Sequence, residues 1–283
     1  MKTLWLTILS FALFANDLFA QKDIIYTDDE LIQKLSTIGE LHNKGLDYAF
    51  EKLHKKYGNT YSGGRTEKDR IEMKNFLEKT AIEFCNSSLS PNDICLDAIK
   101  KSQNGLDYRL STLDLVSQLK NEKVAANMSQ QFYDLINSLD QLVNDDSRNK
   151  NKTEVDNLIK NGIGRLTNYS EKVSLVNSVN TAYSSVSYWS SNYDKWSAFF
   201  PKGSSEMQAR ENPGKKIGKA DIVGIITGGV GGCAYGAIGG TVVVPGVGTL
   251  AGCAALGAGG AITGGLGNSA KAAVESFIDW LVG

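Results

Sequence analysis

The sequence is poor in the residues from which catalytic and metal sites are commonly built. It contains only two histidines, His42 and His54, and its four cysteines show no Cys-x-x-Cys spacing of the kind found in zinc sites. It has no phosphate-binding glycine loop and no nucleophile elbow. The formal net charge is −1, so no basic surplus indicates nucleic acid as a partner. These absences predict a protein that is not an enzyme, carries no metal or cofactor and binds no nucleic acid.

Charge is also missing from one long stretch of the chain. The 49 residues from 222 to 270 carry no charged side chain, and 17 of the 29 glycines fall among them. Glycines recur there at steps of four, and the pattern returns after a turn-like Pro-Gly pair at 245–246. Small residues at this spacing line one side of a helix and let helices approach closely in a bilayer. We therefore predict a glycine-zipper hydrophobic hairpin over 221–268, with zipper positions Gly224, Gly228, Gly232, Gly236, Gly240, Gly248, Gly252, Gly260 and Gly264.

Two other structures fit the same stretch, namely a two-helix core buried in a soluble domain and a flexible coil. The first arm has few strongly aliphatic residues, which makes its insertion into a membrane marginal. We interpret this marginal character as that of a hairpin that passes through export and inserts later.

The start of the chain has the pattern of a signal peptide. Met1 and Lys2 precede an apolar run that ends near Phe14, and Ala20 precedes Gln21 at a small-residue cleavage point. We predict a signal peptide over 1–20, cleavage after Ala20 and a secreted mature chain that starts at Gln21.

The four cysteines fit an oxidising destination, because they fall into two local pairs. Cys85 and Cys95 flank a turn between two helical patterns, and Cys233 and Cys253 lie on opposite arms of the predicted hairpin. We predict one disulfide within each pair, each worth about 3 kcal/mol by the loop-entropy estimate. The alternative is four buried free thiols.

Residues 21–200 predict an α-helical domain, because apolar residues recur there at helical spacing and strand alternation is almost absent. A first helix starts at Thr27 and continues through Leu41, a break covers Gly58 to Gly64, and a second helix opens at Thr66 with Ile71 among its apolar positions. Further helices are expected near 109–120, 123–146, 153–162 and 168–190. The predicted fold class is all-α.

Aromatic residues gather between 183 and 200, including Trp189 and Trp196. They fit either an interfacial or glycan-binding surface or core packing at the end of the helical domain. We expect the tryptophans in the core and the tyrosines near the surface.

A flexible basic linker is predicted over 201–220, where Arg210 is a candidate cleavage site for an arginine-specific protease. The alternative is a solvated linker with no further role. Its lysines, beside the hairpin, favour anionic lipid or lipopolysaccharide. A short amphipathic helix is predicted over 269–283.

The segment Ile38 to Tyr48, IGELHNKGLDY, is similar to an amino-terminal signature of secreted proteins from the Bacteroidetes. This resemblance implies no activity. We interpret its polar members as caps and buried hydrogen bonds around a break at Gly45 and not as a catalytic cluster; they are Glu40, His42, Asn43 and Asp47.

The order of signal peptide, helical domain, linker and zipper hairpin resembles secreted bacteriocins that act on membranes. Pore-forming domains of colicins also carry a hydrophobic hairpin, and Arg210 is similar in position to the activation site of protease-activated Bacteroides bacteriocins. The resemblance implies a toxin whose helical domain shields the hairpin until release. Its expected partners are a target membrane or lipopolysaccharide, a surface receptor, an activating protease, a cognate immunity protein and further copies of itself. The alternative is an envelope-anchored structural protein or adhesin that displays the helical domain.

Overall fold

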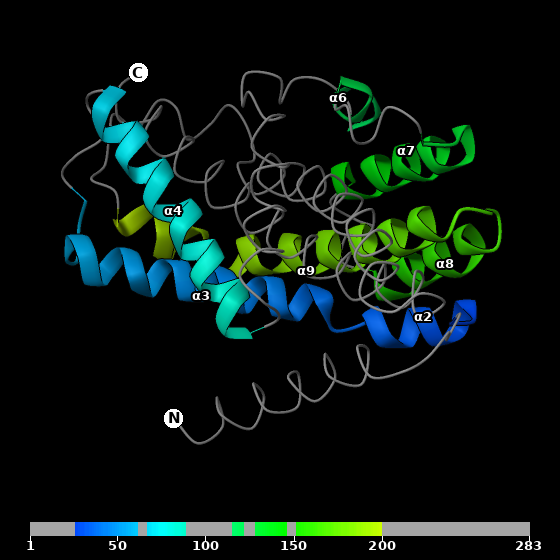
Figure 1. Cartoon of the computed structure of the whole chain (residues 1–283), viewed down its shortest axis with the longest axis horizontal. Helices are drawn as coiled ribbons and strands as arrows, with labels where there is room; N and C mark the ends of the chain where they lie inside the picture. The colour runs from blue at the N-terminus through cyan, green and yellow to red at the C-terminus, as the bar shows by residue number, and fades with distance from the viewer. Residues whose placement is uncertain (1–25, 62–66, 89–114, 122–127, 146–150, 200–283) are drawn as a thin grey trace, which may run out of the picture.

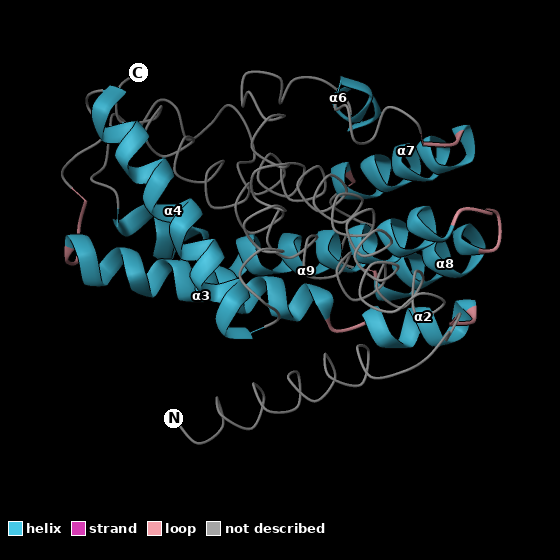
Figure 2. Ribbon diagram, in the orientation of Figure 1, coloured by secondary structure: helices cyan, strands magenta, loops and turns pink. Residues whose placement is uncertain are grey.

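A computed structural model describes residues 26–61, 67–88, 115–121, 128–145 and 151–199, and every regular element among them is a helix (Figures 1 and 2). The helices are α2 (Asp28–Leu35), α3 (Ile38–Tyr57), α4 (Glu67–Ser88), α6 (Leu115–Asn121), α7 (Gln130–Asn144), α8 (Lys152–Ile163) and α9 (Tyr169–Phe199). The predicted all-α class is confirmed for these residues. All of these helices lie in the predicted domain 21–200. The predicted signal peptide, linker, hairpin and terminal helix lie outside the described residues.

Helix α9 is the central element of the bundle. It has 31 residues, and each of the ten from Val173 to Ala182 is buried. It packs against α2 and α3 along one side and against α7 and α8 along another (Figure 1). A helix buried through its middle in this way gains its stability from tertiary packing, because its serines and asparagines are only moderate helix formers. It extends to Phe199, nine residues beyond the predicted end near 190.

The first predicted helix is divided in the structure. Thr27 and Glu30 form a capping box at the predicted helix start, in which the Glu30 amide donates to the Thr27 hydroxyl at 3.3 Å and the Thr27 amide to the Glu30 carboxylate at 2.8 Å. The helix ends at Leu35, and α3 begins at Ile38 after a turn at Ser36 and Thr37. The prediction of one continuous helix through Leu41 was therefore wrong.

The predicted break at Gly45 was also wrong, because α3 continues through it and Gly45 is buried. One glycine costs a helix only about 1 kcal/mol, which the packing of a 20-residue helix can offset. The helix ends instead at Tyr57, where Gly58 has a φ of +82°. This left-handed conformation suits glycine, and it confirms the start of the predicted break.

Small residues allow the central helices to approach closely. A Cβ atom at Gly39 would lie 2.5 Å from the backbone oxygen of Asn180 and 2.3 Å from the Ser184 hydroxyl. A Cβ atom at Gly162, on α8, would lie 2.8 Å from Leu135 of α7 and 3.0 Å from Leu175 of α9. These two glycines fix the contacts α3–α9 and α7–α8–α9.

The remaining predicted helices are found with shifted ends. Helix α8 matches the prediction over 153–162 closely, and α6 fills the described part of the range 109–120 and ends one residue later. Helix α7 starts at Gln130, later than the predicted 123. Residues 109–114 and 122–127 lie outside the described ranges. Helix α4 starts at Glu67 and turns Met73, Leu77 and Ala81 into the core, so that Ile71 is 51% exposed against its expected inward position.

Candidate functional site

The four polar residues of the segment 38–48 do not form one cluster. His42 is fully buried, and its Nδ1 lies 3.2 Å from the Asn43 amide oxygen. The Asn43 amide nitrogen donates to the Ser184 carbonyl of α9 at 3.0 Å. Glu40 and Asp47 are exposed. Part-buried hydrogen bonds are therefore found at His42 and Asn43, and the one from Asn43 attaches α3 to α9.

Asp47 belongs to a second connection between the same two helices. Its carboxylate accepts from the Tyr188 hydroxyl at 3.0 Å and from the Lys195 ammonium at 3.1 Å. The Tyr188 oxygen in turn accepts from the indole nitrogen of Trp196 at 3.1 Å. Burial raises the pKa of the Tyr188 phenol, and the nearby Asp47 carboxylate raises it further. The phenol stays neutral and links a buried indole to an exposed carboxylate.

Aromatic rings fill the space where the end of α9 meets α3. We name this group the aromatic junction, and its members are Phe50, His54, Tyr61, Trp196 and Phe199. Phe50 contacts Trp196 with ring centroids 5.0 Å apart, and His54 contacts Phe199 at 4.9 Å. The backbone amide of Tyr61 donates to the Phe199 carbonyl at 2.7 Å. Pairs of this kind add about 0.5–1.5 kcal/mol each beyond the area they bury.

The aromatic junction decides between the two interpretations of the aromatic segment. Trp189 and Trp196 are 1% and 0% exposed, so the expected core packing is confirmed for both. Tyr188 is 6% exposed, and its expected position near the surface was wrong, because its hydroxyl reaches Asp47 while its ring stays in the core. Burial also raises the pKa of Tyr61 to about 12, so this junction residue is uncharged near neutral pH.

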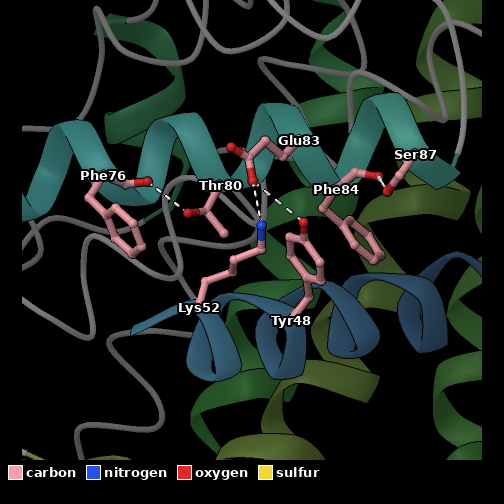
Figure 3. A network of polar contacts seen from close by, with 7 residues as sticks. All are labelled: Tyr48, Lys52, Phe76, Thr80, Glu83, Phe84 and Ser87. Atoms are coloured by element: carbon pink, nitrogen blue, oxygen red, sulfur yellow. Dashed lines mark hydrogen bonds and ion pairs between the residues drawn. The ribbon is translucent and has the colours of Figure 1, made fainter. Parts of the chain in front are cut away.

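An ion pair joins α3 to α4 at the surface (Figure 3). The Lys52 ammonium lies 2.8 Å from the Glu83 carboxylate and 4.9 Å from the centre of the Tyr48 ring. The Tyr48 hydroxyl approaches the same carboxylate at 3.5 Å, and its ring lies 5.6 Å from that of Phe84. The hydrogen bond from Lys52 lowers the pKa of Glu83. Both charged side chains are more than one third exposed, so the pair is worth no more than about 0.2–1 kcal/mol.

The most unusual feature of the described residues is a buried polar face on α9. Ser174, Asn177, Ser178 and Thr181 stand at positions i, i+3, i+4 and i+7 and are at most 1% exposed. Ser178 donates to the Ser174 carbonyl of its own helix at 2.6 Å. Within the part of the chain that the structure describes, no hydrogen-bond partner reaches the Ser174 hydroxyl or either polar atom of the Asn177 amide. We name these four residues the polar face.

Unpaired polar atoms in a core are rare because each costs about 1–3 kcal/mol of desolvation. The polar face is thus a candidate functional feature, because the buried amide of Asn177 carries this cost with no hydrogen-bond partner among the described residues. The sequence does show polar residues at this helical spacing, but the prediction for 168–190 was of a helix alone and did not identify a polar face.

No known family, curated protein or solved structure matches this chain. Among the described residues, no group of three or more His, Cys, Asp and Glu side chains could hold a metal ion. None of the described helices is both long and apolar enough to cross a membrane.

The other predicted site residues lie outside the described residues. These are the nine zipper glycines, Arg210, Ala20 and three of the four predicted disulfide cysteines. Cys85 falls within the bounds of α4, but its side chain is not described. The two disulfides, the linker cleavage and the zipper therefore stay predictions.

Proposed function

We propose that this protein is a secreted antibacterial toxin that inserts a glycine-zipper hairpin into the envelope of a target cell and permeabilises it. The helical domain carries and shields the hairpin, and cleavage at Arg210 in the linker releases it. In this proposal the chain works in the same general way as the bacteriocins that its predicted domain order resembles.

The observation that carries the proposal is the 49-residue stretch without charge, with its glycines at steps of four. In water, glycine weakens a helix by about 1 kcal/mol per position relative to alanine, so such a stretch is a poor choice for a solvent-exposed helix. In a bilayer the same glycines favour association, because helices there are held by close packing and not by the hydrophobic effect. Several copies of the hairpin can then associate through Gly224, Gly228 and Gly232.

The packing of the helical domain supports a carrier role. Its final described residue, Phe199, is anchored by ring contacts with His54 and by the hydrogen bond to Tyr61. The predicted linker starts two residues later. A fixed exit point followed by a flexible linker suits a domain from which a terminal segment is released.

The proposal is tested by adding purified mature chain, intact and cleaved at Arg210, to related bacteria and to dye-loaded anionic liposomes. We expect loss of viability together with dye release, and a stronger effect from cleaved chain. Arg210→Lys keeps the charge and removes the site for an arginine-specific protease, so the protease should no longer enhance dye release. Arg165→Lys, at an exposed arginine outside the linker, is its matched control.

The zipper is tested by Gly232→Leu, with Gly203→Leu in the linker as the matched control. Leucine at 232 separates the helix backbones and should abolish dye release while export is unchanged. Release that persists in Gly232→Leu contradicts the zipper mechanism. Stable binding to envelopes without killing or dye release favours the alternative, an anchored structural protein or adhesin.

A further inference from the structure

The polar face of α9 is shielded from solvent by something that offers it no hydrogen bonds. Asn177 has both amide atoms buried without a partner, and Ser174 has its hydroxyl in the same state. Charged or hydroxyl-bearing side chains packed over the polar face would form hydrogen bonds with Ser174 or Asn177, because leaving either group unpaired in the core costs free energy. The covering group is therefore apolar in character and closely packed.

The contacts that join α9 to the other described helices leave from different sides of the helix. Asn180 donates to the Leu35 carbonyl of α2 at 3.3 Å, and Leu175 approaches Gly162 of α8. Ser187 and Ser190 are exposed. The polar face lies between the side of α9 that contacts α2 and α3 and the side that contacts α7 and α8. At 100° per residue around the helix, the polar face points roughly away from Ser187.

We infer that the polar face of α9 is the docking surface for the first arm of the glycine-rich stretch, with the steps Gly224, Gly228 and Gly232 lying along Ser174, Asn177, Ser178 and Thr181. This inference rests on the proposed function, since it identifies the surface that shields the hairpin before release. It commits to a segment of the same chain as the occupant.

Three properties of the sequence select this occupant. Residues 222–270 are the longest uncharged stretch of the predicted mature chain, which fits a cover without polar partners. Glycines on one helix and serines on the other permit a backbone approach that larger residues would prevent. The polar face spans about 10 Å along α9, and two zipper steps span about 12 Å, at 1.5 Å per residue.

The length of the predicted linker allows this arrangement. Asn177 lies 22 positions before Phe199, which is about 33 Å along a helix. The 20 residues of the linker reach about 66 Å when extended, so the chain can return to the middle of α9 with length to spare.

The inference is tested in the full mature chain by the coupling between two substitutions. Ser174→Ala removes a buried unpaired hydroxyl and should raise the thermal midpoint by about 2–4 °C. In a Gly232→Leu background the zipper arm no longer fits, the face meets water, and the same substitution should give no rise. Ser187→Ala, on the exposed side of α9, is the matched control and should give no shift in either background.

Equal shifts for Ser174→Ala in the two backgrounds would overturn the inference, because the cover would then be independent of the zipper. If those equal shifts also grow with protein concentration, the cover is a second copy of the chain. No shift in the parent background also overturns it. Should Gly232→Leu fail to yield folded protein, Gly232→Ala, which adds one methyl group, takes its place and must reduce the shift.

The outcomes separate docking from the toxin proposal. Coupling between Ser174→Ala and Gly232→Leu without dye release from liposomes would support the docking surface and contradict the toxin proposal. Dye release without this coupling would support the toxin proposal and contradict the docking surface.

Discussion

Replacing Asn177 by leucine should stabilise this protein, although most core substitutions destabilise. Asn177 is fully buried, and neither its amide nitrogen nor its amide oxygen has a hydrogen-bond partner among the described residues. Leucine has the same branched shape and no polar atoms, so the substitution removes the desolvation penalty with little change in packing.

The expected gain follows from the burial. Leaving a buried polar group unpaired costs about 1–3 kcal/mol, and one kcal/mol moves the thermal midpoint of a domain of this size by about 2–4 °C. We therefore expect a rise of about 2–12 °C in the thermal midpoint of the mature chain, measured by far-ultraviolet circular dichroism. The matched control is Asn137→Leu on α7, where the asparagine is exposed and the change should stay within about 0.5 kcal/mol.

A fall in the midpoint of Asn177→Leu, with Asn137→Leu unchanged, would refute this reasoning. It would mean that the amide holds a partner such as an internal water, which buried polar sites often contain. In liposome assays the stabilised variant should release dye more slowly than the parent, because release of the hairpin then uncovers an apolar leucine.

Three further predictions concern the described contacts. Tyr188→Phe removes the acceptor of a buried indole and should lower the unfolding free energy by about 1–3 kcal/mol in urea titrations; a loss below 0.5 kcal/mol would contradict this role. Glu83→Gln removes the partner of Lys52 and should cost about 0.2–1 kcal/mol at pH 7. Pairing lowers the pKa of Glu83, so this contribution is present above the unfolded pKa of about 4.3 and is lost as the pH falls through the lower folded pKa. The unfolding free energies of parent and variant should therefore converge in acid and diverge again on return to neutral pH. Gly39→Ala should cost about 1–3 kcal/mol because its Cβ would meet backbone at 2.5 Å, whereas Gly164→Ala, with open space around it, should be nearly neutral; equal effects would show that α3 and α9 can separate freely.

Local signals in the sequence predicted several helix ends well. The helix start at Thr27, the end of α3 at Gly58 and the extent of α8 depend on residues close together in the chain, and the structure has them as expected. The burial of Trp189 and Trp196 also followed from their position in a helical domain.

Features set by tertiary contacts were not predictable in the same way. Gly45 continues a helix because packing offsets its weak propensity, and Tyr188 is buried because Asp47 and Trp196 supply partners for its hydroxyl. The polar face could have been noticed from spacing alone. That its amide is shut off from water without a partner is a property of the assembled helices, and no local pattern carries it.

The hydrogen bond from Tyr61 to the Phe199 carbonyl has a mechanical consequence for the end of α9. The last carbonyls of a helix normally lack partners, so a pull on the chain beyond them unwinds the final turn first. Here the carbonyl is held by a segment that follows α3, and the Tyr61 and Phe199 rings stack 6.2 Å apart. Tension on the end of α9 is therefore shared with the segment that follows α3, which should delay unwinding of the final turn.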